Sequence, residues 1–533
     1  MSYIPGEILL YICVHAFCTQ ANRLERTRKM KRKILTLLAT MMSFIVLTVT
    51  VSASGTCSIT IKSSTSGVSV AGKTFTAYQL FSVTTSGDQN QNVAYEFAND
   101  SVQEWMRVYF KDENLVAYQA VEKINGLTET LDMFANDVMN AIKSDELSLE
   151  GKQSIESDGN VVIQGLQPGY YLIYETTTNQ SIYSASILAT TMGDHNVNLK
   201  AEIPTMDKKV DGQDKITASV GDEVTFTLTS KVPDMTGYNK YYFIVRDTMT
   251  EGLAYKTDSM VITLGDATLS EGNDYYIEQV QEDGKVKLKI VFNDFIQYKQ
   301  QKGESIVITY MATVTDSIIN IGNATNTADI VYSNNPNYDY EGNTPNTGNP
   351  NDPTNPNWPE DKKPPLEESE ESIVTVYSFY FDLIKVDQDK KPLSGATFVI
   401  YDQDPTQNSN LEILGEGTSG DDGKVTFIKN GQKVALKAGT YYIVETQAPD
   451  GYNKLTKPIV ITITESGGFE ATIDGQPKEI VKGTITFNVE NRTGTLLPET
   501  GGMGTKIFMI VGASLMLGSA VLLVTKKIVQ EKK

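Results

Sequence analysis

The chain has 533 residues, enough for three or four domains of about 150 residues each. Its formal net charge of −20 at pH 7 argues against a nucleic-acid partner, because phosphate binding requires a basic face. We interpret this acidity as a solvated, soluble exterior.

A secretory signal peptide is predicted near the N-terminus. A basic segment over 30–33 precedes an apolar run and a small-residue site that ends at Ala53. This order predicts a signal peptide over 30–53, and the small-residue site favours cleavage over the alternative of an N-terminal membrane anchor. We interpret residues 1–29 as a start-site artefact.

Cysteine and histidine are scarce in the predicted mature chain. Cys57 is its single cysteine, so no internal disulfide is expected. His195 is its single histidine, which argues against a Ser-His-Asp triad and against a histidine metal cluster. We therefore expect no cofactor and no metal site, and a secreted enzyme is disfavoured.

Residues 54–202 are predicted to form a β-sandwich with a helical insertion. Leu131, Phe134, Val138 and Ile142 follow helical spacing within 101–143. Strand patterns flank this stretch at 58–61, 73–81, 161–163 and 169–175.

The next three regions differ in pattern. Residues 203–333 alternate almost throughout, with turn residues between short strands, which predicts a second β-sandwich. Residues 334–371 are rich in Asn, Pro and acidic residues and predict a flexible, partly extended linker or insertion. Strand patterns resume over 372–495 and predict a third β-sandwich.

Two distant pairs of segments repeat each other. The segments 72–78 and 169–176 parallel the segments 395–401 and 439–446. The first and third domains are therefore predicted to be versions of one small sandwich. The expected fold class is mainly β, with tandem immunoglobulin-like or prealbumin-like β-sandwiches and a C-terminal transmembrane helix.

The C-terminal region 497–533 has three parts in a fixed order. Leu497-Pro498-Glu499-Thr500-Gly501 precedes an apolar run over 507–525, long enough to span a bilayer, and then a basic tail. This order resembles the cell-wall sorting signal of Gram-positive surface proteins. The resemblance implies that a sortase cleaves between Thr500 and Gly501 and passes the acyl group to an amine, anchoring the protein to peptidoglycan.

The third domain contains a lysine, a glutamate and an asparagine in strand contexts: Lys385, Glu445 and Asn491. These segments resemble the B-type repeat domain of collagen adhesins and Gram-positive pilins. The resemblance implies an isopeptide bond between Lys385 and Asn491, with Glu445 as the catalytic acid. Burial lowers a lysine pKa and raises a glutamate pKa, so a neutral amine can attack the amide while ammonia leaves. The alternative is that strand alternation points Lys385 and Glu445 outward.

The second domain offers another trio, Lys208, Asp247 and Asn326. The domain resembles the fimbrial isopeptide-forming domain over nearly its whole length. This resemblance implies Lys208 as nucleophile, Asp247 as acid and Asn326 as acceptor. The neighbours Lys209 and Asn323 are the alternatives, and Asp247 has a second interpretation as a strand-end turn residue.

The first domain keeps Glu175 and places Lys62 in a comparable strand, with an asparagine available at Asn196 or Asn198. First domains of the resembled family often lack the bond, so the sequence leaves open whether a bond forms here.

Lys200 lies at the junction of the first two domains. Backbone pilins of the resembled family carry a lysine at this place, usually in a Tyr-Pro-Lys motif, and here Asn198 and Leu199 precede it. The resemblance implies that Lys200 accepts Thr500 of the next subunit.

The sequence thus predicts a structural major pilin on the surface of a Gram-positive cell. Its expected partners are sortase, other copies of itself, ancillary pilins, peptidoglycan and host surface ligands. The alternatives are a monomeric wall-anchored adhesin and an ancillary tip or base pilin.

Overall fold

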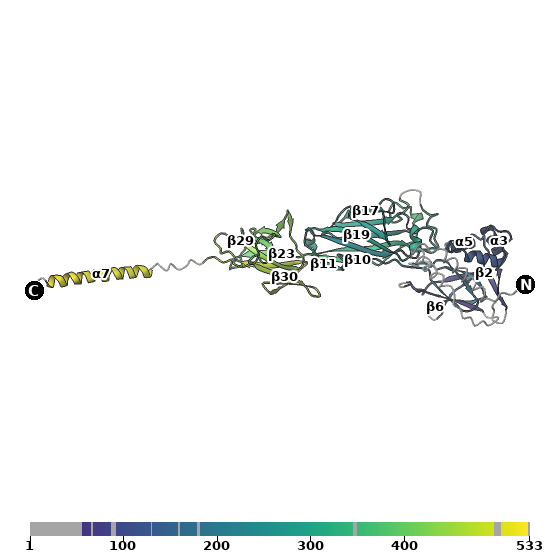
Figure 1. The fold of residues 1–533 in the computed structure, drawn as a ribbon, viewed down its shortest axis with the longest axis horizontal. Coiled ribbons are helices and arrows are strands. Elements are labelled where there is room, and N and C mark those ends of the chain that lie inside the picture. The colour runs from purple at the N-terminus through teal and green to yellow at the C-terminus, as the bar shows by residue number, and fades with distance from the viewer. Residues whose placement is uncertain are drawn as a thin grey trace, which may run out of the picture.

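The computed structural model describes residues 56–65, 68–86, 92–128, 130–157, 160–177, 182–344, 349–494 and 503–530. The predicted signal peptide and the segment Leu497–Gly501 lie outside the described residues. The fold is mainly β, as predicted, and three β-rich units follow one another along the long axis (Figure 1). We call them the first unit (β1–β9 with α3–α5), the second unit (β10–β22) and the third unit (β23–β33).

The first unit consists of two sheets and a helical insertion. One sheet has the order β5-β6-β1-β9, and the other has the order β3-β2-β7-β8 with β4 on β2. Helices α3–α5 lie between β3 and β4 and bury Phe134 and Val138 with Leu80 and Leu172 of the second sheet. The helical insertion is therefore confirmed. The strands are β1 (Cys57–Lys62), β2 (Phe75–Ser86), β3 (Asn92–Phe97), β4 (Gly151–Gln153), β5 (Ile155–Ser157), β6 (Asn160–Leu166), β7 (Gly169–Glu175), β8 (Ile187–Thr191) and β9 (His195–Asn198), and the helices are α3 (Asp100–Tyr109), α4 (Ala117–Asn125) and α5 (Leu131–Lys143).

The second unit packs two larger sheets around an aromatic core that includes Phe226, Phe243 and Tyr310. One has the order β10-β12-β19-β15-β16 with β14 on β19, and the other has the order β11-β22-β20-β13-β18-β17 with β21 on β20. Its strands are β10 (Asp207–Val210), β11 (Lys215–Thr217), β12 (Glu223–Lys231), β13 (Phe243–Met249), β14 (Leu253–Tyr255), β15 (Val261–Leu264), β16 (Ala267–Thr268), β17 (Tyr275–Glu282), β18 (Lys285–Phe292), β19 (Ser305–Val314), β20 (Asn323–Ser333), β21 (Leu366–Glu368) and β22 (Ser372–Tyr377), and its short helices are η1 (Phe295–Gln301), α6 (Ile318–Ile321) and η2 (Glu360–Lys362).

The segment between β20 and β22 differs from the flexible linker expected over 334–371. Tyr340 and Trp358 are buried and pack against Tyr242, and the buried Asp352 forms an ion pair with the half-buried Lys289. The segment is an insertion anchored on the second unit, because its few aromatic residues find partners there. Strand β22 then pairs with β20 and β11, so the residues predicted to open the third sandwich belong to the second unit.

The third unit has a three-stranded sheet, β26-β23-β33, and an eight-stranded sheet, β28-β27-β25-β24-β29-β30-β31-β32. The parallel pairing of β23 with β33 joins its first and last strands, as the pairing of β1 with β9 does in the first unit. The strands are β23 (Tyr380–Val386), β24 (Thr397–Tyr401), β25 (Gly415–Thr418), β26 (Lys424–Val425), β27 (Ile428–Lys429), β28 (Gln432–Lys433), β29 (Gly439–Gln447), β30 (Ile459–Glu465), β31 (Phe469–Ile473), β32 (Gln476–Lys478) and β33 (Thr484–Glu490).

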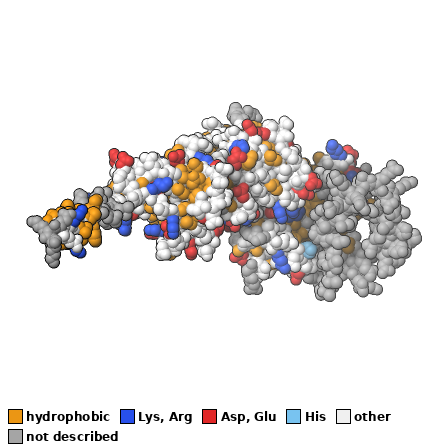
Figure 2. Space-filling view, turned by 60° about the vertical axis from the view of Figure 1, so that its left-hand side comes forward, with side chains coloured by type: hydrophobic (Ala, Val, Ile, Leu, Met, Phe, Trp, Pro, Cys, Tyr) orange, Lys and Arg blue, Asp and Glu red, His pale blue; other side chains and the backbone are white. Residues whose placement is uncertain are grey.

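Helix α7 (Met503–Gln530) contains one apolar span, Ile507–Ile528, whose 22 residues are enough to cross a membrane. Its hydrophobic side chains are exposed, whereas the visible face of the β-rich units carries scattered charges of both signs (Figure 2). This contrast agrees with a soluble body and a membrane-spanning helix.

Candidate crosslinking and attachment sites

The third unit brings Lys385, Glu445 and Asn491 together in its core. Each of the three residues is at most 1% exposed. Lys385 shares the inward face of β23 with Phe381 and Leu383, so the alternative of an outward-pointing lysine does not apply. The parallel pairing of β23 with β33 brings Asn491 alongside, where its backbone N–H donates to Val386 O at 3.0 Å.

The contacts of this trio centre on the Glu445 carboxylate. Glu445 Oε1 accepts a hydrogen bond from Asn491 Nδ2 at 2.8 Å and lies 4.0 Å from Lys385 Nζ. Glu445 Oε2 accepts the Leu455 N–H at 2.7 Å, and Lys385 Nζ donates to Val489 O at 2.9 Å. Burial lowers the pKa of Lys385 to about 8, an effect that Glu445 partly opposes. An amine, a carboxyl group and an amide thus meet away from water.

The second unit brings Lys208, Asp247 and Asn326 together from β10, β13 and β20. All three residues are buried, and Lys208 Nζ contacts Asp247 Oδ2. Asp247 lies opposite Ala328 within the β13–β20 ladder, which excludes the strand-end turn as its position. Of the neighbouring alternatives, Lys209 is partly exposed and pairs with Asp214, and Asn323 is half-buried at the start of β20.

Tyr310 on β19 joins this trio and was missed by the sequence reasoning. It is fully buried, and its hydroxyl contacts all three side chains. The alternation of Ile306, Ile308 and Tyr310 places them on one face of β19 and could have indicated that the tyrosine points inward. The rings of Phe226 and Tyr310 lie 5.4 and 5.5 Å from Lys208 Nζ, and burial lowers the pKa of this lysine.

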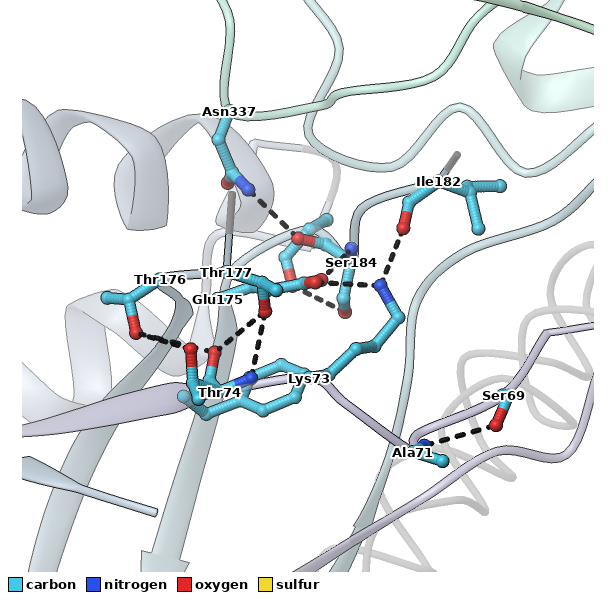
Figure 3. Close-up of polar contacts among 12 residues, drawn as sticks. Ser69, Ala71, Lys73, Thr74, Glu175, Thr176, Thr177, Ile182, Ser184 and Asn337 are labelled. Carbon is cyan, nitrogen blue, oxygen red and sulfur yellow. Dashed lines mark hydrogen bonds and ion pairs between the residues drawn. The ribbon is translucent and has the colours of Figure 1, made fainter. Parts of the chain in front are cut away.

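The first unit does not bring Lys62 to Glu175. Lys62 is exposed, and the buried partner of Glu175 is Lys73, whose Nζ lies 2.7 Å from Glu175 Oε1 (Figure 3). Lys73 Nζ also donates to Ile182 O at 2.6 Å, and Glu175 Oε2 accepts the Ser184 N–H at 2.7 Å. The bond considered for this domain therefore has no suitable lysine at position 62, because the inward residues of β1 are Cys57, Ile59 and Ile61.

The strand registers show which residues of the first unit lie at the positions of Lys385 and Asn491. Lys62 lies opposite Asn198 in β1–β9, as Val386 lies opposite Glu490 in β23–β33. The next backbone hydrogen bond, Leu199 N to Lys62 O, matches Asn491 N to Val386 O. Ile61 and Leu199 consequently occupy the positions of Lys385 and Asn491.

Lys200 lies directly after this position, between the first and second units. Its N–H donates to Ser184 Oγ at 3.1 Å, and its carbonyl oxygen accepts the Ala185 N–H at 3.1 Å. The residue is half-buried, and burial lowers the pKa of its amine, while the charges of Asp234 and Asp132 oppose this shift.

Comparisons with known proteins agree with this geometry. Residues 380–477 match the model of the SpaA prealbumin-like fold domain, and residues 491–531 match the LPXTG cell wall anchor motif. The trypsin-resistant surface T6 protein of Streptococcus pyogenes serotype M6 is 26% identical over 403 residues, covering 62% of this chain and 69% of that protein. These matches show that the chain is similar to sortase-assembled backbone pilins of Gram-positive bacteria, and they support that assignment.

Two further similarities concern fimbrial proteins. The fimbrial subunit type 1 of Actinomyces viscosus is 25% identical to this pilin over 415 residues, covering 67% of this chain and 73% of that protein. The solved T6 backbone pilin of S. pyogenes, described as a modular three-domain structure, has a TM-score of 0.50 at 20% identity and covers 84% of this chain and 100% of that one. This pilin is a structural subunit with a cell-wall anchor, located on the cell surface.

Proposed function

We propose that this pilin forms the shaft of a pilus, with Thr500 of one copy joined to Lys200 of the next, and that each copy carries two internal Lys–Asn isopeptide bonds. The bonds would join Lys208 to Asn326 and Lys385 to Asn491. The observation that carries the proposal is the presence of two buried sites that each bring an amine, a carboxyl group and a primary amide together. Glu445 contacts Asn491 directly in the third unit, and the Tyr310 hydroxyl links Asp247 to Asn326 in the second unit. Ancillary pilins and a host surface ligand are further partners under this proposal.

The chemistry of each internal bond follows from burial. A charged amine and a charged carboxylate are both costly in an apolar core, so burial favours the neutral amine and the neutral acid. The lysine Nζ attacks the asparagine Cγ, the Cγ–Nδ2 bond breaks, and ammonia leaves with one proton from the amine. The acid is regenerated, so each site acts once on its own chain and does not turn over.

The intersubunit joint is supported by the environment of Lys200. A sortase acyl intermediate must be attacked by a neutral amine, and burial lowers the pKa of Lys200 towards that state. The two hydrogen bonds of its backbone to the segment 184–185 hold the residue at the unit boundary. Lys208 follows Lys200 closely in the chain, and Asn491 shortly precedes Thr500. A pulling force between neighbouring subunits would therefore act on each copy close to its internal bonds.

Intact mass spectrometry of a recombinant ectodomain, residues 54–500, tests the internal bonds. We expect a mass that is lower than the sequence mass by two ammonia molecules. Asp247→Ala and Glu445→Ala should each restore one ammonia. An unmodified mass in the wild-type ectodomain would refute both bonds.

Electrophoresis of cell-wall extracts tests the polymer. We expect a ladder that survives boiling in detergent and collapses to monomer in Lys200→Ala. The matched control is Lys209→Ala, which removes a nearby, partly exposed lysine and should leave the ladder intact. A single band in wild-type cells would support the monomeric adhesin instead.

A further inference from the structure

The two candidate bond sites differ in how the acid reaches the asparagine. The inference that we draw from this difference rests on the proposed function above. In the third unit, Glu445 Oε1 accepts directly from Asn491 Nδ2 at 2.8 Å. In the second unit the acid is an aspartate, shorter by one methylene group. Among the described residues, no hydrogen bond joins Asp247 to Asn326, and both Asp247 Oδ1 and Asn326 Oδ1 lack a partner.

Tyr310 fills this gap with its hydroxyl group. The hydroxyl donates to Asp247 Oδ2 at 2.8 Å and accepts from Asn326 Nδ2 at 2.6 Å. Lys208 Nζ lies 3.2 Å from the same oxygen. The tyrosine oxygen is therefore the atom that connects the acid to the nitrogen that must leave, a connection that Glu445 makes by itself in the third unit.

We propose that Tyr310 is a catalytic residue of the second unit, where it relays a proton from Asp247 to the leaving amide nitrogen. As Lys208 Nζ bonds to Asn326 Cγ, the amine gives one proton to Asp247 Oδ2. Once Asp247 is protonated, its hydrogen bond with Tyr310 reverses, so the acid donates to the Tyr310 oxygen and the hydroxyl turns to the amide nitrogen. Asp247 then passes its own proton to the Tyr310 oxygen, and the Tyr310 hydroxyl passes its proton to Nδ2. The Cγ–Nδ2 bond breaks, ammonia leaves, and the acid and the phenol end in their starting protonation states.

The environment of Tyr310 suits a proton donor. Burial raises the pKa of its hydroxyl well above the ordinary value of 10, so the group stays protonated at neutral pH. The ring stacks on Phe226 at a centroid distance of 5.4 Å and meets Tyr255 edge-on at 5.7 Å. This packing fixes the hydroxyl position, and it is kept when the hydroxyl alone is removed.

The test is Tyr310→Phe in the recombinant ectodomain, with ammonia loss followed by intact mass during cell-free synthesis. General acid–base catalysis contributes on the order of a hundredfold or more, so we expect the second-unit bond to form at least about a hundredfold more slowly. The third-unit bond serves as an internal control and should form at the wild-type rate. Tyr238→Phe is the matched control, because its buried hydroxyl donates to Ser333 O and does not contact the trio.

The outcomes separate this proposal from the proposed function. A wild-type chain that loses no ammonia contradicts the internal bonds themselves. A wild-type chain that loses two ammonia molecules, together with a Tyr310→Phe chain that loses both at the same rate, overturns the role of Tyr310 alone.

A double variant guards against a folding defect. Tyr310→Phe combined with Asp247→Glu removes the relay and lengthens the acid, so the carboxyl group should reach Asn326 as Glu445 reaches Asn491. Recovery of the second ammonia loss supports the relay. A double variant that resists trypsin and still lacks the bond overturns it.

Discussion

The first and third units share the parallel pairing of their first and last strands, but the buried glutamate has different partners in the two units. In the third unit Glu445 lies between Lys385 and Asn491, whereas in the first unit Ile61 and Leu199 occupy the positions of that lysine and asparagine. The acid alone therefore does not mark a bond site. Under the proposed function, the residues at the inward position of the first strand and just after the last strand decide whether a bond can form.

The retained acid in the first unit has acquired a different partner. Lys73 lies two residues before Phe75, which pairs with Glu175, just as Ala396 lies two residues before Phe398, which pairs with Glu445. A buried carboxylate without a counter-charge is strongly destabilising, and Lys73 provides that charge. The pair then holds the segment 182–184, whose Ser184 contacts the backbone of Lys200.

Removing the buried glutamate should abolish a crosslink in the third unit and leave the number of crosslinks unchanged in the first unit. Glu445→Gln should abolish the third-unit bond, and loss of a crosslink that closes a loop of roughly 100 residues should lower the free energy of unfolding by about 4 kcal/mol. Intact mass and thermal unfolding measure the two effects. Glu175→Gln is the control in the first unit and should leave the ammonia count unchanged.

The missing bond should be transferable to the first unit. Ile61→Lys with Leu199→Asn restores the two partners, and Lys73→Ala frees Glu175 and reproduces the alanine of the third unit. We expect this triple variant to lose one more ammonia molecule than the wild-type ectodomain. A folded triple variant with an unchanged ammonia count would show that the strand registers do not define the site.

Removing one partner of the Lys73–Glu175 ion pair should lower the free energy of unfolding more than replacing both partners with apolar residues. Lys73→Met leaves Glu175 buried and unpaired, and we expect a loss of about 3 kcal/mol. Lys73→Met with Glu175→Leu removes both charges and should unfold close to the wild-type midpoint. Urea titration followed by fluorescence of Trp105, which lies in α3 of the first unit, compares the two variants.

Sequence patterns identified most of this architecture and the two trios, and the failures have physical causes. Lys62 lies in a strand comparable to that of Lys385, but period-2 alternation directs Ile61 inward and Lys62 to solvent. Lys73 and Tyr310 were missed because their partners lie far away in sequence, on strands whose pairing the sequence does not specify. The segment 334–371 has few apolar residues, and its aromatic anchors Tyr340 and Trp358 were too sparse to form a period.

The long distance between Lys385 and Glu445 should make the rate of bond formation in the third unit depend on pH. Lys385 Nζ lies 4.0 Å from Glu445 Oε1, against 2.7 Å between Lys73 and Glu175, and the pKa of Lys385 is lowered to about 8. Below this value the amine is mainly protonated and cannot attack, so bond formation should accelerate as pH rises and level off above about 8. Each pH unit below the pKa changes the neutral fraction about tenfold, which sets the expected change in rate between pH 6 and 7.

The Asp247→Ala ectodomain isolates this effect, because only the third-unit bond can then form and a single ammonia loss reports it. Cell-free synthesis in buffers from pH 6 to 9, quenched in acid at intervals, yields the rate from intact mass. Trypsin resistance at each pH controls for slow folding. A rate that stays constant across this range would indicate that the proton moves within the Lys385–Glu445 pair, without release to solvent, and would remove the contrast with the tight pair of the first unit.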